Sequence, residues 1–408
     1  MAARPQTEKA NVNPECRSLL RQCKQSLRRP ELDSFSGLEV KLSYLSLQLA
    51  TRRASPARGN NRSEETVIIK TRTPARAGLI GNPSDGFNGV TIAFTFDAFW
   101  AEVVLWESPE LEIRGWVRDR VNFESVGDLV HNVVNYGYYG GVRLIKATIK
   151  VFADYCRKLE IELDHKNFTL SYKSDIPLRV GLAGSSAIIT STLRALMQFY
   201  GVSIPRQILP NLIMSAETEE LKIPAGLQDR VVQTYGGVVY MDFDKELMAR
   251  GFGHYESLDP SLLPPLFIAY DDSATEGTEV FHTDIRERYR RGEKLVIDTL
   301  TEIAEGARRF REAMEAGDVT EMNRLMDHNF DLRARIYRIS DLNLRLVNTA
   351  RELGASAKLS GSGGAVVGMY PDEETYRRME EGCCRIGAKI VRPRIAQDFA
   401  LRHQPKDP

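Results

Sequence analysis

The pattern of hydrophobic and polar residues in the first half of the chain predicts strands and helices that interleave. Short runs rich in β-branched residues at positions 66–70 and 90–96 predict strands. Apolar residues then recur at helical spacing over residues 140–158 and 187–199, and a strand is expected between them at 168–172. A β-rich start is therefore expected, followed by helix, strand, loop and helix.

The second half of the chain has a different rhythm. A turn-rich stretch at residues 258–265 precedes an expected strand at 266–270. Long charged helical patterns then cover residues 276–315 and 319–336, and a glycine-rich segment at 358–369 becomes strand-like. Because strands and helices do not alternate as they do in a doubly wound sheet, the predicted fold class is α+β with two domains.

The length of the chain supports this division. A chain of 408 residues with 42% hydrophobic residues exceeds the usual size of a single core. We expect one domain at residues 66–257, a second at 258–395, and a tail at 396–408.

Residues 1–65 differ from the rest, with 12 lysines and arginines against 7 acidic residues, a net charge of +5. We expect a basic, poorly ordered leader that contains a short amphipathic helix at 16–27. A targeting peptide is the alternative, although acidic residues are untypical of transit peptides.

Composition excludes several classes of protein. The chain carries 55 basic and 55 acidic side chains, so no overall field favours nucleic acid or an anionic membrane. No apolar run approaches the roughly 20 residues of a membrane-spanning helix. The five cysteines and six histidines show no metal-ligand spacing. We therefore expect a soluble cytoplasmic protein without nucleic-acid or membrane partners; its oligomeric state is not predicted.

The clearest chemical signal is a glycine-serine loop between the strand at 168–172 and the helix at 187–199. Small residues let the backbone approach a ligand closely, and N–H groups at a helix N-terminus attract phosphate. Its spacing is not that of a Walker loop or a dinucleotide-binding turn. A plain turn with Ser185 as the helix N-cap is the alternative. The predicted phosphate-binding residues are Gly181, Leu182, Ala183, Gly184, Ser185 and Ser186.

This loop resembles the second motif of the GHMP kinases, the family of galactokinase, homoserine kinase, mevalonate kinase and phosphomevalonate kinase. Residues 73–85, TPARAGLIGNPSD, resemble the first motif, and residues 358–365, KLSGSGGA, resemble the third. Three motifs in the family's order are far more specific than any one of them. The resemblance implies ATP as phosphoryl donor. It also implies a ribosomal protein S5 domain 2-like N-terminal domain and a ferredoxin-like C-terminal domain.

The resemblance further implies roles for individual residues. Asp229, within PAGLQDR at 224–230, matches the catalytic aspartate that orients or deprotonates the acceptor hydroxyl. Arg76 matches a basic residue near that aspartate and the transferring phosphoryl group. From the residues alone, Asp229 is also a good helix N-cap and Arg76 a surface arginine at a strand end.

Phosphate and metal binding are implied in the same way. Gly361, Ser362 and Gly363 of the third motif are expected to close the far side of the phosphate site, with a tight turn into a strand as the alternative. Glu217 matches the Mg²⁺-ligand glutamate and Ser186 the serine that completes the coordination, both through the oxygen atoms that this cation prefers. For Glu217, a solvated helix face is the alternative.

Within the family, residues 81–85, 138–144, 226–230 and 361–367 are similar to the plant glucuronokinases. These enzymes make glucuronate 1-phosphate from D-glucuronate and ATP for UDP-glucuronate synthesis. The similarity implies a small sugar acid as substrate, phosphorylated on its anomeric C1 hydroxyl. A kinase for another acceptor, such as galacturonate or a galactose-like sugar, and a non-catalytic sugar or nucleotide sensor are the alternatives.

Sugar contacts are implied at two positions of the first motif. Asn82 and Asp85 stand where galactokinases hold sugar hydroxyls, although Asn82 replaces a glutamate. A sugar acid also needs a cation for its carboxylate, which a bidentate guanidinium meets best. Arg143 and Arg230 are the candidates, with Arg179 third; each is otherwise a structural or surface arginine.

Overall fold

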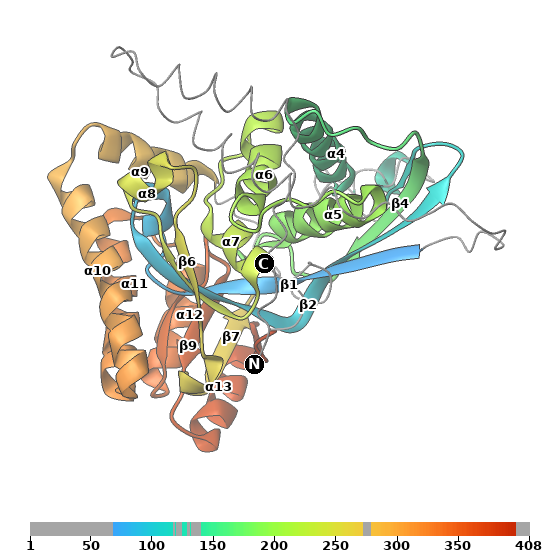
Figure 1. Ribbon diagram of the computed structural model, residues 1–408. Coiled ribbons are helices and arrows are strands. Elements are labelled where there is room, and N and C mark those ends of the chain that lie inside the picture. The colour runs from blue at the N-terminus through green and yellow to red at the C-terminus, as the bar shows by residue number, and fades with distance from the viewer. Residues whose placement is uncertain are drawn as a thin grey trace, which may run out of the picture. The chain divides into compact units, whose positions relative to one another are not determined.

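The computed structural model describes residues 68–116, 119, 125–128, 131, 140–271 and 279–396, which belong to one compact unit (Figure 1). The predicted leader at 1–65, with its helix at 16–27, lies outside the described residues. The same holds for all of the predicted tail except Ala396.

A six-stranded sheet is built around the long strand β2 (Val90–Ser108). Strand β1 (Ile68–Ile80) pairs antiparallel with nearly the whole length of β2. Strands β4 (Asn167–Ser174) and β5 (Val238–Asp242) pair antiparallel with the two ends of β2. Strand β3 (Glu112–Arg114) is parallel to β4, and β6 (His254–Leu258) is antiparallel to β5.

Helices cover this sheet and carry much of the cavity described below. Helices α4 (Val142–Lys158) and α5 (Gly184–Tyr200) pack on each other, and α5 packs on β1 and β2 (Figure 1). Helix α6 (Leu209–Ser215) runs into a π-helical turn, η4 (Ala216–Glu220). Helix α7 (Gln228–Tyr235) packs on β1, β2 and α5, so its first turn lies near the glycine-serine loop.

A second, four-stranded antiparallel sheet has the order β10, β7, β9, β8. When these strands are numbered along the chain, their order in the sheet is 4-1-3-2, which is the order of a ferredoxin-like sheet. This order confirms the ferredoxin-like fold predicted for the C-terminal part of the chain. The strands are β7 (Leu266–Tyr270), β8 (Ser356–Leu359), β9 (Ala365–Met369) and β10 (Lys389–Val391). Five helices lie between or beside them: α9 (Glu279–Arg290), α10 (Lys294–Ala316), α11 (Val319–Ile336), α12 (Asp341–Glu352) and α13 (Glu373–Arg385).

The two sheets share one hydrophobic core. Phe94 of β2, Ile268 of β7 and Phe310 of α10 belong to a single buried cluster. The chain also returns to the first sheet at its described end, where the Ala396 N–H donates to the Thr95 carbonyl oxygen at 2.9 Å. The division at residue 257 stays a prediction. In the described part of the chain, no helix is long and apolar enough to span a membrane.

Most predicted elements occur within a few residues of their expected positions, and two differ instructively. The charged pattern at 276–315 forms two helices, α9 and α10, because Gly292 adopts a φ of +77° between them. Strand β1 extends to Ile80, well past the predicted 66–70, because β2 offers it a partner along its whole length. Several elements were not predicted: the strands β3, β5, β6 and β10, the helices α6, η4, α12 and α13, and the short helices η2 (Ser84–Phe87), α8 (Lys245–Ala249) and η5 (Pro260–Leu262).

Candidate active site

A cavity of about 660 Å³ opens where the three sequence motifs meet. Its wall combines β1 and the loop after it, the glycine-serine loop with the start of α5, the segment leading into α7, and the turn before β9. Predicted site residues on its wall are Arg76, Asn82, Asp85, Arg143, Gly181, Leu182, Ala183, Gly184, Ser185, Glu217, Asp229, Arg230, Gly361 and Ser362. Segments as far apart in sequence as Arg76 and Ser362 thus share one site.

Arg76 connects three walls of this cavity. Its Nε donates a hydrogen bond to Oδ1 of Asp229 at 2.6 Å. Its Nη1 donates to the carbonyl oxygens of Gly181, at 2.7 Å, and Ser360, at 3.1 Å. The side chains of Arg76 and Asp229 are only 6% and 18% exposed. Arg76 therefore lies within strand β1 as a buried cation, not as a surface arginine at a strand end.

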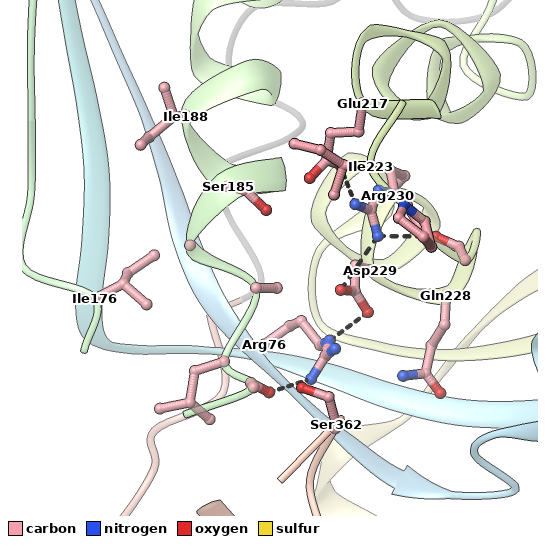
Figure 2. A pocket seen from close by; sticks show the side chains of 18 of the residues that line it. Arg76, Ile176, Ser185, Ile188, Glu217, Ile223, Gln228, Asp229, Arg230 and Ser362 are labelled. Carbon is pink, nitrogen blue, oxygen red and sulfur yellow. Dashed lines mark hydrogen bonds and ion pairs between the residues drawn. The ribbon is translucent and has the colours of Figure 1, made fainter. Parts of the chain in front are cut away.

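A second arginine faces Asp229 from the adjacent position. Nη1 of Arg230 lies 3.3 Å from Oδ2 of Asp229 and donates to the Gly226 carbonyl oxygen at 2.9 Å. Its Nη2 forms an ion pair with the buried carboxylate of Glu217. Figure 2 shows Asp229 between Arg76 and Arg230, with Ser185 across the cavity. Glu217 is thus held inside the protein and does not lie on a solvated helix face.

These contacts set the ionisation of Asp229. Burial by itself disfavours the charged carboxylate, but Arg76 and Arg230 outweigh it and hold the pKa of Asp229 below its ordinary value. The carboxylate therefore stays ionised at neutral pH. It can accept a hydrogen bond from a ligand hydroxyl that enters the cavity.

A third carboxyl group, Asp85 of η2, behaves in the opposite way. Burial and the neighbouring charge of Asp229 raise its pKa to about 6, against the lowering influence of Arg76. Asp85 approaches the backbone before α7 so closely that a Cβ at Gly226 would overlap its Oδ2. Two carboxyl groups with separated pKa values therefore share one end of the cavity.

The second and third motifs are in direct backbone contact. A Cβ placed on Gly361 would lie 2.5 Å from the Gly181 carbonyl oxygen and 2.9 Å from Nη1 of Arg76. Gly181 itself adopts a φ of +66°, and a Cβ there would lie 3.0 Å from the Ser362 nitrogen. Both glycines are therefore required by close approach, and the tight turn at Gly361 also forms part of the cavity wall.

The two loop serines face different ways. Ser185 lies on the cavity wall, whereas the Ser186 hydroxyl is buried and donates to Oε1 of Gln233 at 2.6 Å. Gly363 also lies off the wall, against the side chain of Asn343. The metal-ligand role of Ser186 would need a different side-chain rotamer, and it stays a prediction.

The Asn82 side chain is held by a buried lysine. Lys358, at the end of β8, donates from its Nζ to Oδ1 of Asn82 and to the Gly78 carbonyl oxygen at 2.9 Å. Nδ2 of Asn82 donates to the Leu359 carbonyl oxygen at 3.3 Å. Burial, with the charges of Arg333 and Arg76, lowers the pKa of Lys358 well below its ordinary value. The Asn82 amide thus joins the first motif to the third, with its polar atoms already engaged.

Sequence reasoning missed several polar residues on the wall, among them Gln228 and Arg286. Gln228 precedes Asp229; its side chain is buried, and its Oε1 has no hydrogen-bond partner among the described residues. Arg286 of α9 reaches the wall from the second half of the chain. It lies in the charged run RERYRR, where nothing in the sequence distinguishes it from the arginines beside it.

The charge of the cavity favours anionic ligands. Five lining arginines stand against three lining acids, a net charge of +2 when all are ionised. The arginines are Arg76, Arg143, Arg179, Arg230 and Arg286, and the acids are Asp85, Glu217 and Asp229.

One side of the cavity is apolar. Ile176, Leu178 and Ile188 line it beside the glycine-serine loop. In Figure 2, Ile176 and Ile188 lie on the side of Ser185, across from Asp229. The cavity therefore offers an apolar surface at one end, backbone N–H groups in the middle and charged groups at the other end.

Comparison with protein families agrees with this geometry. Residues 143–237 match the model described as GHMP kinases N terminal domain, and residues 310–389 match GHMP kinases C terminal. Two relatives from Arabidopsis thaliana are similar over most of the chain. Probable glucuronokinase 2 is 44% identical over 81% of this chain and 92% of its own length. Glucuronokinase 1 is 42% identical over 82% of this chain and 94% of its own length.

Solved structures share the fold at low sequence identity. Galactokinase from Lactococcus lactis, in complex with galactose, superposes with a TM-score of 0.64 at 17% identity, covering 87% of this chain and 98% of its own. Mevalonate kinase from L. major, in complex with R-mevalonate, superposes with a TM-score of 0.60 at 16% identity, covering 83% of this chain and 99% of its own. At such identities these structures speak for the architecture alone.

Proposed function

Because this chain belongs to the GHMP kinase family, we propose that it phosphorylates the anomeric C1 hydroxyl of D-glucuronate with ATP, giving glucuronate 1-phosphate and ADP. The observation that carries the proposal is the identity of 44% and 42% to two glucuronokinases across more than nine-tenths of their length. The arrangement of Asp229, Arg76 and the glycine-serine loop supports it, since phosphoryl transfer needs positioning and charge neutralisation more than covalent chemistry. The product would feed UDP-glucuronate synthesis.

We propose that the donor ATP binds at the glycine-serine loop. Helix α5 begins at Gly184, and its free N–H groups and positive dipole end favour the phosphates. The turn at Gly361 and Ser362 closes this region from the opposite side. The apolar wall of Ile176, Leu178 and Ile188 suits the base.

Asp229 is proposed as the catalytic carboxylate. Its low pKa means that it orients the acceptor hydroxyl as a hydrogen-bond acceptor and takes the proton once phosphoryl transfer has made that hydroxyl acidic. Arg76 contacts Asp229 and the loop at the same time, so its cation can balance charge that develops on the transferring group.

The residues present fit a divalent cation with few protein ligands. Within the described residues, no group of three or more His, Cys, Asp or Glu side chains is arranged to hold a metal ion by itself. Mg²⁺ commonly takes only one or two carboxylates and fills its octahedron with phosphate and water oxygens. We propose that Glu217 and the hydroxyl of Ser186, after a rotamer change, hold it. When bound, it would neutralise charge on the ATP phosphates.

We propose that the acceptor binds at the end of the cavity formed by the first motif and the start of α7. Asp85, beside Gly226, can accept hydrogen bonds from sugar hydroxyls. Arg143 and Arg230 also line the cavity and are kept as proposed acceptor contacts. Asn82 is proposed to act mainly by holding the first motif in place, because Lys358 and the Leu359 carbonyl already engage its amide.

A cytoplasmic location fits the thiol groups. Cys156, Cys383 and Cys384 are free in the structure. Secreted proteins usually pair such residues in disulfides, whereas cytosolic proteins keep them reduced. We therefore propose that the reaction takes place in the cytoplasm.

Product analysis tests the proposed function. The protein is incubated with ATP, Mg²⁺ and D-glucuronate, and phosphorus NMR identifies the product. The expected product is a sugar 1-phosphate formed in equal amount with ADP. The absence of glucuronate 1-phosphate under conditions in which the protein binds ATP would refute the proposal.

A further inference from the structure

An acceptor of the proposed kind places a carboxylate at one end of the cavity. In the pyranose form of D-glucuronate, C1 and C5 both flank the ring oxygen, so the reacting C1 hydroxyl and the C6 carboxylate lie near each other on either side of that oxygen. A cation that holds the carboxylate must therefore lie near the group that receives the hydroxyl and keep N–H donors that no protein carboxylate already engages. This condition disfavours the arginines that are already paired with acids.

Two of these arginines are already paired with Asp229. Arg76 contacts its Oδ1 at 2.6 Å, and Arg230 lies 3.3 Å from its Oδ2. Arg230 is also paired with Glu217 and bonded to the Gly226 carbonyl. Both guanidinium groups are thus engaged at the reacting end of the cavity.

Arg286 meets the condition. Its Nη2 donates to the Ala225 carbonyl oxygen at 3.2 Å, four residues before Asp229 along the chain. Within the described residues, that carbonyl is its one hydrogen-bond partner, and no ion pair engages it. The remaining N–H groups of its planar fork can therefore bind a carboxylate in the cavity that it lines.

Packing on both sides fixes the position of Arg286. The preceding residue, Ile285, is buried against α10 and the end of α11. Three residues later, the Tyr289 ring packs on Phe87 of η2 with a centroid distance of 4.9 Å. Since η2 also carries Asp85, the first motif and α9 are held side by side, and the cation is positioned before a ligand arrives.

We propose that Arg286 binds the C6 carboxylate of the acceptor and is the main determinant of selectivity for sugar acids over neutral sugars. This assignment rests on the proposed function. It adds a residue from the second half of the chain to a site whose other predicted acceptor contacts come from the first half.

The test is steady-state kinetics of Arg286→Ala with D-glucuronate and with D-glucose, which differs only in carrying an alcohol at C6. Loss of a charged hydrogen-bond partner predicts a rise in KM for glucuronate of roughly 10- to 100-fold. The KM for ATP and the low kcat/KM for glucose should remain unchanged. Arg286→Lys, which retains the charge but not the fork, should raise the KM less. Arg290→Ala, an exposed position one turn along α9, is the matched control and should change nothing.

An unchanged KM for glucuronate in Arg286→Ala overturns the assignment. An equal loss of kcat/KM with glucuronate and glucose does so as well, because it reports a structural defect. A KM effect confined to Arg143→Ala would transfer the role to Arg143. Absence of glucuronate turnover in the unaltered protein is a different outcome: it refutes the proposed function itself, and the assignment with it.

Discussion

At the scale of single residues, the site separates two aspartates by their surroundings. Asp229 contacts two arginines, which keep its pKa low, whereas burial and the neighbouring Asp229 charge raise the pKa of Asp85 to about 6. Groups whose pKa values are pushed apart commonly divide the work of an active site between them. We assign hydroxyl orientation to Asp229 and acceptor binding to Asp85.

Replacing Asp229 by asparagine removes the proton acceptor but keeps the size of the side chain. We expect Asp229→Asn to lower kcat by roughly 10³-fold or more, in line with the loss of a general base. The dissociation constant for ATP, measured by calorimetry, should change little. Asp298→Asn, on the exposed face of α10, serves as the control. Normal kcat in Asp229→Asn would remove Asp229 as the catalytic carboxylate.

The raised pKa of Asp85 predicts a pH dependence of acceptor binding. Below about pH 6 the carboxyl is protonated and loses acceptor capacity, so kcat/KM for the acceptor should fall as the pH drops through 6. Asp85→Asn should lower kcat/KM at neutral pH and abolish this fall at low pH. If the fall in kcat/KM near pH 6 persists in the variant, another group is responsible for it.

The same group affects stability with a definite sign. The folded protein binds the Asp85 proton more tightly than the unfolded chain does, so the unfolding free energy falls as the pH rises from 3.8 towards 6. The change in melting temperature that Asp85→Asn causes should therefore be more favourable at pH 7 than at pH 4, by roughly a few degrees. An effect of Asp85→Asn on the melting temperature that is equal at the two pH values, or less favourable at pH 7 than at pH 4, would contradict the proposed environment of Asp85.

At the scale of elements, the site depends on how closely two loops approach. Gly361→Ala would place a methyl group 2.5 Å from the Gly181 carbonyl oxygen, so the turn before β9 must move away from the glycine-serine loop. We expect a destabilisation of roughly 1–3 kcal/mol, typical of overpacking, and weaker ATP binding.

Gly306→Ala is the control. Gly306 lies within α10 with open space around it, so this substitution should stabilise the protein by up to about 1 kcal/mol. Thermal unfolding and ATP calorimetry check both variants, and unchanged values for Gly361→Ala would show that the loops do not constrain each other.

Some of the elements were predictable from sequence, whereas strands such as β5 and helices such as α12 and α13 were missed. Strand β7 and helix α11 begin and end where the periodicity indicates, because their buried faces repeat at the period of a strand or a helix. The break between α9 and α10 was missed because charged residues continue across Arg291 and Gly292. Helical propensity there does not reveal a glycine that adopts a positive φ.

At the scale of the whole molecule, Lys358 joins the two sheets. From β8 it donates to the Gly78 carbonyl oxygen of β1 and to Asn82 in the loop that follows. Lys358→Met would leave these buried acceptors without a donor and should destabilise the protein by roughly 2–4 kcal/mol. The melting temperature of this variant is compared with that of Lys294→Met, an exposed position at the start of α10. Equal melting temperatures would mean that Lys358 does not stabilise the contact between the two sheets.

Contacts between distant segments are the part of the site that could not be predicted from the sequence. The resemblance to the GHMP kinases identifies Arg76 in the first motif, and Glu217 and Asp229 in segments between the second and third motifs. The placement of Arg286 arises only when α9 packs beside η2 through Tyr289 and Phe87. The inward hydroxyl of Ser186 likewise depends on Gln233, 47 residues away. Contacts between distant segments leave no local pattern in the chain.

The most direct test of the account is the ratio of kcat/KM for D-glucuronate to that for D-glucose, measured by ADP release with saturating ATP and Mg²⁺. We predict a ratio of at least roughly 10², since a charged contact with Arg286 favours the acid and leaves the neutral sugar without a partner. A ratio near one, a preference for glucose, or no ADP release with glucuronate would contradict the account.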